Sequence, residues 1–247
     1  MKINKITVNT TLWLAIVFFI GGLIIDLCKG PSLDFWQNAA LGIFGSLLVA
    51  AIVSYVGYLH EKKKILDSVY QSLVFIYRNC CSLDIVLANL AKNLETKIAT
   101  QQIVAELEIA RRIDNLKPIQ AILEYSSFTN SQINRFFIEL RNLLNSFYME
   151  AMVKDIQIVL LEYQLMDKEK KLFSKYDDLT LQEKYDNVFK VLSDKRETNK
   201  KLCNTVEKFI VKMEKFYTPA LLWEEQKKYI AAEVQRIYAE LQKMNQQ

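Results

Sequence analysis

Glycine is scarce in this chain, and no glycine follows Gly57. Tight β-hairpin turns and phosphate-binding loops depend on glycine, because their backbone takes conformations that other residues resist. Proline is also rare, with only three residues in the whole sequence, so few positions interrupt a helix. The stretch after Gly57 therefore suits long helices and argues against β-hairpins and Walker-type nucleotide loops. We predict an all-α fold.

The arrangements of residues on which many enzymes rely are missing as well. His60 is the only histidine and lies in a basic cluster, so no Ser/His/Asp or Cys/His arrangement can form elsewhere. The four cysteines include no C-x-x-C pair, and a zinc site or a redox pair therefore has no support. We expect Cys80 to be a small core residue. The sequence predicts a protein that is not an enzyme, with no catalytic residue, no metal site and no cofactor.

Two long apolar runs are present near the beginning of the sequence, at residues 10–28 and 37–59. A hydrocarbon core ~30 Å thick needs about 20 apolar residues in a helix, and both runs reach this length. A cleaved signal peptide is the alternative for the first run, but no A-x-A-like site follows it. A buried core helix is the alternative for the second, but residues 35–59 carry no charge. We predict a transmembrane helical hairpin with residues 29–36 as its external loop.

Basic residues flank this hairpin on both sides, whereas its loop has one Lys and one Asp. Those before the first span are Lys2 and Lys5, and those after the second are Lys62, Lys63 and Lys64. Because positive charge marks the cytoplasmic side of a span, we expect residues 1–9 and 60–247 in the cytoplasm, where thiols stay reduced. The three lysines after the second span should contact anionic lipid headgroups, for about 1 kcal/mol each.

Beyond the second span, apolar residues recur at alternating spacings of three and four. They are Leu66, Val69, Leu73, Ile76, Cys80, Leu83, Leu87, Leu90 and Leu94. This heptad pattern is typical of a coiled coil, and no proline or glycine interrupts it. We therefore predict one helix from about residue 37 to about residue 98. At 1.5 Å per residue it would be roughly 90 Å long.

The rest of the cytoplasmic stretch predicts a bundle of long helices. One starts after the capping residues at 126–131 and continues to about residue 175. The next opens at a capping box formed by Thr180 and Glu183 and ends near Tyr217.

A last helix is predicted to be capped by Thr218, with Pro219 at its first position. It has its own heptad seam, formed by Trp223, Lys227, Ile230, Val234, Ile237, Leu241 and Met244. The charged seam residue Lys227 is a common way of fixing register or partner number. The two seams either pack against other helices of a monomeric bundle or join copies of the chain, and the sequence supports both readings.

Small residues form a ridge on one face of the second span. They are Gly42, Ser46, Ala50 and Ser54. Such a ridge lets helix backbones approach closely in lipid, so it either joins copies into a homo-oligomer or receives the first span near Gly21 and Gly22. Asp26 lies at the outer end of the first span. It either faces water or, in an assembly of hairpins, forms a ring with the Asp26 residues of the other copies at the mouth of a pore, where the ring attracts cations.

Basic residues also cluster on a later predicted helix, at Lys195, Arg196, Lys200 and Lys201. The cluster is either a solvated helix face or a binding face for an anionic ligand, or for an acidic or RNA-bearing protein partner. The net charge of the chain is only +4, whereas strong non-specific nucleic-acid binding usually needs a more one-sided field. We expect no direct sequence-specific binding of nucleic acid.

The layout of the chain, with two spans at 10–59 and helices to residue 247, resembles the two-transmembrane effectors of bacterial anti-phage defence. These include effectors that accompany some retron reverse transcriptases, and abortive-infection proteins with a hairpin and a helical cytosolic domain. The resemblance rests on arrangement, and no functional residue is carried over. It implies a multi-pass protein of the bacterial inner membrane that stays silent until infection and then disrupts or permeabilises that membrane. The trigger would be a regulatory protein partner, such as a reverse transcriptase–RNA complex, or a small nucleotide signal.

A membrane-tethered helical scaffold or adaptor without pore activity is the alternative function. It explains the two heptad seams equally well. Replacing the hairpin by an unrelated membrane anchor separates the two functions, because a scaffold would keep its function and an effector would lose it.

Overall fold

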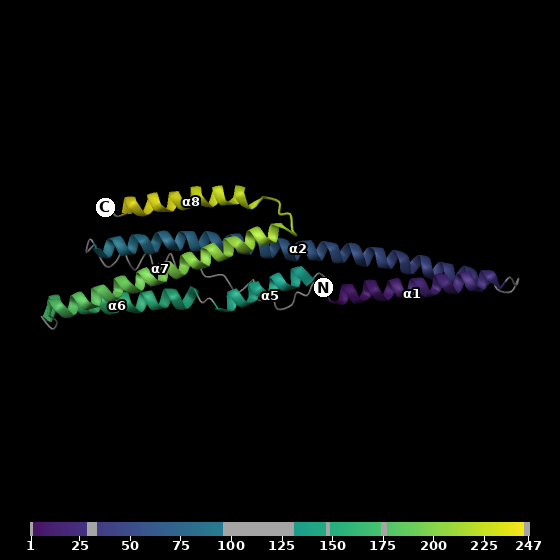
Figure 1. Cartoon of the computed structure of the whole chain (residues 1–247), viewed down its shortest axis with the longest axis horizontal. Helices are drawn as coiled ribbons and strands as arrows, with labels where there is room; N and C mark the ends of the chain where they lie inside the picture. The colour runs from purple at the N-terminus through teal and green to yellow at the C-terminus, as the bar shows by residue number, and fades with distance from the viewer. Residues whose placement is uncertain (1, 29–33, 96–130, 147–148, 174–176, 245–247) are drawn as a thin grey trace. The chain divides into compact units, whose positions relative to one another are not determined.

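The computed structural model of the chain describes residues 2–28, 34–95, 131–146, 149–173 and 177–244 (Figure 1). The helices in these residues are α1 (Lys2–Leu27), α2 (Asp34–Glu95), α5 (Ser131–Ser146), α6 (Met149–Phe173), α7 (Asp178–Glu214) and α8 (Trp223–Met244). No strand occurs in the part of the chain that the structure describes. The all-α prediction is confirmed.

Helix α2 is unbroken from Asp34 to Glu95, as the heptad pattern and the lack of helix breakers predict. Residues 96–98, where the predicted helix was to end, lie outside the described residues. The helix predicted from 131 to about 175 is described as α5 and α6, and residues 147–148 and 174–176 also lie outside the described residues.

The beginnings of α7 and α8 differ from the prediction. Helix α7 is capped by Asp177, whose side chain accepts a hydrogen bond from the backbone N–H of Thr180 at 2.9 Å, so Thr180 is the donor rather than the cap. Helix α8 begins at Trp223 rather than at Pro219. The reason is a carboxylate at the end of α7, because Glu214 accepts the backbone N–H of Trp223 at 2.7 Å.

The contacts of the chain divide it into two compact units. The first unit comprises Met1–Ser68 and Glu124–Phe136, and the second comprises Val69–Leu123 and Phe137–Gln247. The boundary falls within α2, so the apolar run at 37–59 belongs to the first unit and most of the heptad seam belongs to the second.

The first unit contains a hairpin made by α1 and the beginning of α2. The rings of Phe19 and Phe44 lie 5.0 Å apart between the two helices. Gly22 is buried at this contact, and a Cβ atom there would lie 3.5 Å from the side chain of Leu41. Between the two helices, the amide of Gln37 donates a hydrogen bond to the carboxylate of Asp26 at 3.0 Å.

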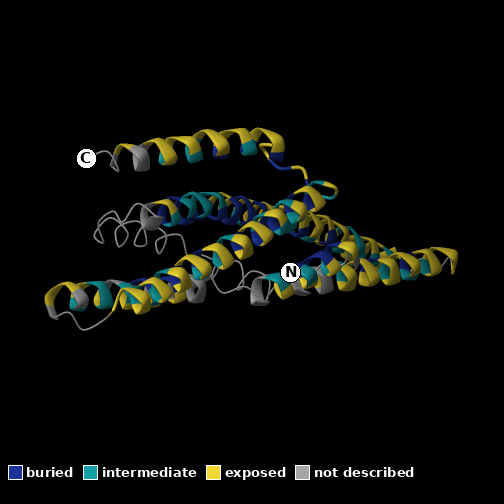
Figure 2. Cartoon of the chain, turned by 60° about the vertical axis from the view of Figure 1, so that its left-hand side comes forward, coloured by how far each residue is buried: buried dark blue, intermediate teal, exposed yellow. Residues whose placement is uncertain are grey.

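Two helices of the structure, α1 and α2, are long and apolar enough to span a membrane. In each, only 11% of the most apolar 18-residue window is buried, whereas the core helix of a soluble protein would be mostly buried. Large apolar side chains such as Trp13 and Val49 are exposed instead. Figure 2 colours the helices of the chain by this burial. Exposed apolar surface of this extent is typical of a segment that meets lipid or another protein.

In the second unit, α7 is the helix on which the others pack. Helix α6 runs antiparallel to it, with ion pairs between Lys195 and Asp155 at 2.6 Å and between Lys184 and Glu162 (Figure 1). The rings of Tyr163 and Tyr185 also meet between these helices, at 5.9 Å. Helices α2, α5 and α8 contact α7 through further polar pairs.

Candidate functional site at the interface of α2 and α7

The heptad seam of α2 is buried in the structure. The buried members are Leu66, Val69, Leu73, Ile76, Cys80, Leu83, Leu87 and Leu90. The side chain of Leu94 is not among those described. Helix α7 contributes a buried row of its own, formed by Val188, Leu192, Asn199, Leu202, Val206, Ile210 and Met213. The α2 seam therefore packs within one chain, which is one of the two arrangements that the sequence allowed.

Polar contacts show that α2 and α7 are antiparallel. Tyr70 of α2 pairs with Glu214 near the end of α7, whereas Asp84, further along α2, pairs with Arg196 nearer the beginning of α7. Residues 80 and 199 meet between these two pairs. A single register is therefore fixed at three levels along the interface.

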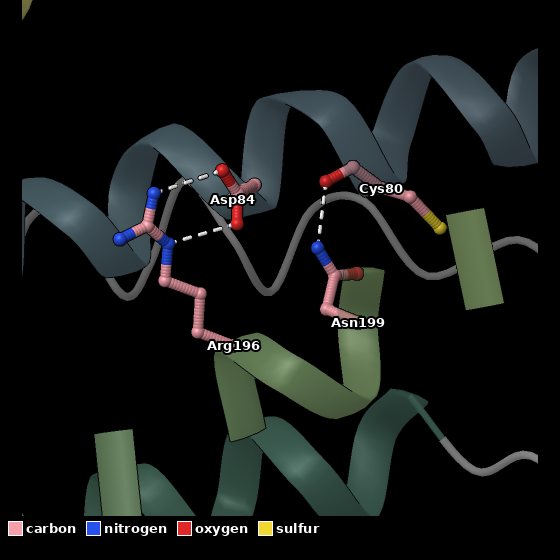
Figure 3. Close-up of polar contacts among 4 residues, drawn as sticks. All are labelled: Cys80, Asp84, Arg196 and Asn199. Carbon is pink, nitrogen blue, oxygen red and sulfur yellow. Dashed lines mark hydrogen bonds and ion pairs between the residues drawn. The ribbon is translucent and has the colours of Figure 1, made fainter. Parts of the chain in front are cut away.

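Asn199 is the only polar side chain in the buried row of α7. Its amide nitrogen donates a hydrogen bond to the backbone carbonyl of Cys80 at 2.8 Å (Figure 3). Its Oδ1 atom is buried and has no hydrogen-bond partner among the described residues. A buried amide at a heptad position costs stability unless it is hydrogen-bonded, and here the carbonyl of Cys80 satisfies its donor.

Asp84 and Arg196 form a two-pronged ion pair close to Asn199 (Figure 3). The Nε and Nη2 atoms of Arg196 donate to the two carboxylate oxygens of Asp84, at 2.9 and 3.2 Å. Planar, paired hydrogen bonds of this kind give directional specificity as well as attraction. Both side chains are partly exposed, so the pair is accessible to solvent and to competing charges.

Glu214 joins three helices at the opposite end of the interface. Its Oε1 atom accepts hydrogen bonds from the hydroxyl of Tyr70 at 2.9 Å and from the backbone N–H of Trp223 at 2.7 Å. Burial, followed by the hydrogen bond to Glu214, raises the pKa of Tyr70, so its hydroxyl stays protonated as a donor. Trp223 in turn packs edge-on against Tyr77 at 4.7 Å. The start of α8 is thereby tied to both α2 and α7.

The seam of α8 is directed toward the rest of the second unit. Trp223 and Ile230 are buried, and the side chains of Leu241 and Met244 are not among those described. The seam residue Lys227 donates to Glu207 of α7 at 2.5 Å, and Arg78 of α2 pairs with Glu233. Opposite charges on α7 and α2 thus fix the position of α8.

Two thiols that the sequence analysis did not connect also meet at this interface. The sulfur atoms of Cys81 on α2 and Cys203 on α7 lie 3.7 Å apart. Their separation in the sequence carries no spacing signal, and only the packing of α2 on α7 brings them together. Cys80, by contrast, is buried in the core as predicted.

The small-residue ridge of α2 is not the face that receives α1 at Gly22. Gly42, Ser46 and Ala50 are exposed and Ser54 is half-buried, whereas the contact with Gly22 is made by Leu41 and Ala40. The hydroxyl of Ser46 donates to the carbonyl of Gly42 at 3.0 Å, within the same helix. Helix α1 therefore does not cover Gly42, Ser46 or Ala50 of the ridge.

The other charged residues predicted near the spans lie on the surface. Asp26 is exposed and accepts the hydrogen bond from Gln37. Lys63 and Lys64 are exposed, and Lys62 is half-buried.

The basic cluster on α7 is largely engaged in ion pairs. Arg196 pairs with Asp84 and Lys195 with Asp155, so these two residues join helices. Lys201 pairs with Glu197 one turn away at 2.7 Å, and Lys200 is exposed. An anionic ligand at Arg196 or Lys195 would have to displace a carboxylate that already occupies the position.

The hydrogen bonds and ion pairs of this interface hold α2, α7 and α8 in one arrangement. In the described residues, no group of three or more His, Cys, Asp and Glu side chains is placed to hold a metal ion. Comparisons of the chain with protein-family models, with curated proteins and with solved structures return no match.

Proposed function

We propose that this chain is a membrane effector of bacterial anti-phage defence, of the abortive-infection type. In this proposal the hairpin lies in the inner membrane, both termini are cytoplasmic, and the bundle of α5 to α8 on α2 restrains the hairpin. A regulatory protein partner, such as a reverse transcriptase–RNA complex, or a small nucleotide signal releases the restraint. The released hairpins then disrupt or permeabilise the membrane and stop growth.

The observation that carries the proposal is the continuity of α2. One unbroken helix, Asp34–Glu95, contains both the exposed apolar run and the seam on which α7 packs. No glycine or proline separates residue 59 from the seam, so no flexible linker uncouples the two parts. A change in how α7 packs on α2 is therefore made on the same helix that enters the membrane.

Assembly of several copies is a required step, because one hairpin cannot enclose a path for ions. The exposure of Gly42, Ser46 and Ala50 supports a contact between copies along this ridge. Asp26 would then lie at the outer mouth of the shared path, where carboxylates attract cations.

The experiment is a measurement of membrane potential, with a voltage-sensitive dye, in bacterial cells that express the full chain carrying Asp84→Arg. This change places a like charge against Arg196 and so releases the restraint by α7. We expect depolarisation together with growth arrest, and we expect Gly42→Leu and Ala50→Leu to abolish both by blocking the close approach of helices. Gly42 has open space around it, so the added side chain does not disturb the single hairpin. Ile52→Leu is the matched control, because Ile52 is exposed on the same helix but lies on another face than the ridge.

Arrest of growth with a normal membrane potential would contradict the pore mechanism. The alternative, a tethered helical scaffold, is tested by replacing residues 1–59 with an unrelated two-span hairpin. Function that survives this exchange identifies a scaffold, and function that is lost while the chain remains membrane-bound supports the effector.

A further inference from the structure

The thiols of Cys81 and Cys203 form a pair at the surface of the α2–α7 interface. Their sulfur atoms lie 3.7 Å apart, and both residues are partly exposed, so a small oxidant can reach them. The two flanking contacts, Asn199 with Cys80 and Arg196 with Asp84, hold the helices in register at this position. The thiols therefore face each other without any movement of the helices.

We propose that Cys81 and Cys203 form a disulfide on oxidation by a hydroperoxide, and that this bond staples α7 to α2. A disulfide needs the sulfur atoms at about 2.05 Å, which the side chains can reach from the present contact by adjusting their torsion angles. Disulfides in cytosolic proteins are usually transient and redox-sensing, so a reduced resting state fits this assignment.

Hydrogen bonding favours Cys81 as the attacking thiolate. A hydrogen bond from Cys203, and a second from Tyr77, lower the pKa of Cys81. The same hydrogen bond, together with burial, raises the pKa of Cys203, which keeps its proton and acts as the donor. A thiolate, rather than a thiol, reacts with a peroxide.

The reaction balances with hydrogen peroxide as the two-electron oxidant. The Cys81 thiolate attacks one peroxide oxygen, the O–O bond breaks, and a sulfenic acid forms. The other oxygen leaves as hydroxide and becomes water with the proton that the Cys81 thiol released on ionisation. The Cys203 sulfur then attacks the Cys81 sulfur, the S–O bond breaks, and the second oxygen leaves as water with the Cys203 proton. Two thiols are oxidised to one disulfide, and one peroxide is reduced to two water molecules.

Cys80 and Cys28 do not compete for this bond. Cys80 is fully buried, and burial raises its pKa to about 12, so it has little thiolate. Cys28 is exposed but belongs to the first unit, outside the α2–α7 interface. Its exposed thiol could link two molecules, and a Cys28→Ser variant removes that reaction.

The test uses the full chain carrying Cys28→Ser, purified in detergent under reduction and then treated with hydrogen peroxide. Remaining thiols are blocked with N-ethylmaleimide, and the protein is digested with trypsin without reduction. We expect peptide 79–92 linked to peptide 202–208, and two separate peptides after treatment with dithiothreitol. Adding Cys80→Ala leaves one cysteine in peptide 79–92 and should preserve the link, whereas Cys81→Ser and Cys203→Ser should each abolish it.

Three results would overturn the assignment: full blocking of Cys81 and Cys203 after peroxide, a link made by Cys80 instead, or a sulfinic acid at Cys81 without a bond. The functional consequence rests on the proposed function, because a staple would keep α7 on α2 and hold the effector inactive. The restraint of the reduced protein opens transiently, whereas the disulfide prevents this opening. Dye release from phosphatidylethanolamine–phosphatidylglycerol vesicles should therefore be lower for the oxidised than for the reduced protein. If the disulfide forms but dye release does not change, the disulfide is established and the proposed restraint of the hairpin by α7 is contradicted.

Discussion

Single polar side chains decide how α2 and α7 meet. The apolar seams would tolerate a shift by a heptad, because one Leu or Val replaces another. Arg196 does not tolerate it, since the carboxylate of Asp84 has no counterpart one heptad away, where Tyr77 and Ala91 stand. Asn199 adds a buried donor that needs an acceptor. Register at this interface is therefore set by a few polar atoms within a mostly apolar contact.

Replacing the buried amide by a carboxylate tests this role. Asn199→Asp keeps the size of the side chain but removes the N–H donor and buries a charge beside a carbonyl. We expect the free energy of unfolding at pH 7, measured by urea denaturation in detergent, to fall by about 2–4 kcal/mol. Asn204→Asp, at an exposed position of the same helix, is the matched control and should change it by less than about 0.5 kcal/mol.

The pH dependence of the Asn199→Asp variant has a definite sign. Burial should raise the pKa of the introduced carboxyl in the folded state above its unfolded value of about 4. Below that value the group is protonated in both states and can donate to the carbonyl, so the loss of stability should shrink as the pH falls. A loss that stays constant from neutral pH to pH 4 would contradict the account of the buried donor.

At the scale of elements, α8 depends on a carboxylate that belongs to α7. The first N–H groups of a helix need acceptors, and Glu214 supplies one for Trp223 while it also holds the hydroxyl of Tyr70. The start of α8 is therefore determined by a contact between helices rather than by its own capping residues. This explains why Thr218 and Pro219, which have the local features of a helix start, precede the helix.

Glu214→Ala should loosen α8 while leaving the other helices formed. Loss of an acceptor with two partly buried donors costs about 1–3 kcal/mol, and this cost falls on the docking of α8. Hydrogen exchange measured by mass spectrometry should be faster in α8 of the variant than in α8 of the unmodified protein, whereas exchange in α6 should stay the same. Glu225→Ala removes an exposed carboxylate from the first turn of α8 and is the control. Equal exchange in both variants would show that Glu214 does not hold the helix.

The sequence predicted those parts of the fold that depend on local spacing. The heptad positions from Leu66 to Leu90 are buried because their spacing places them on one helix face, wherever the partner helix comes from. The pairs between Asp84 and Arg196 and between Cys81 and Cys203 were not predicted, since each joins residues more than a hundred positions apart. Nothing in local periodicity states which helix covers which seam. The sequence around Arg196 accordingly allows either a solvated helix face or a binding face, and it does not indicate the internal partners Asp84 and Asp155.

At the scale of the whole molecule, the proposed function depends on where the two parts of α2 reside. The apolar run at 37–59 must lie in lipid, and the seam that starts at Leu66 must lie on the cytoplasmic side, next to the basic residues 62–64. Assembly, release and the disulfide staple all presuppose this division. Two native cysteines report on the two sides, because Cys28 follows α1 and Cys203 belongs to α7.

Labelling of these cysteines with a membrane-impermeant maleimide in spheroplasts tests the division most directly. Two variants are compared, one retaining only Cys28 and the other only Cys203, before and after lysis of the membrane. We predict that Cys28 reacts in intact spheroplasts and that Cys203 reacts only after lysis. Labelling of Cys203 in intact spheroplasts, or recovery of the full chain in the soluble fraction without detergent, would contradict the account.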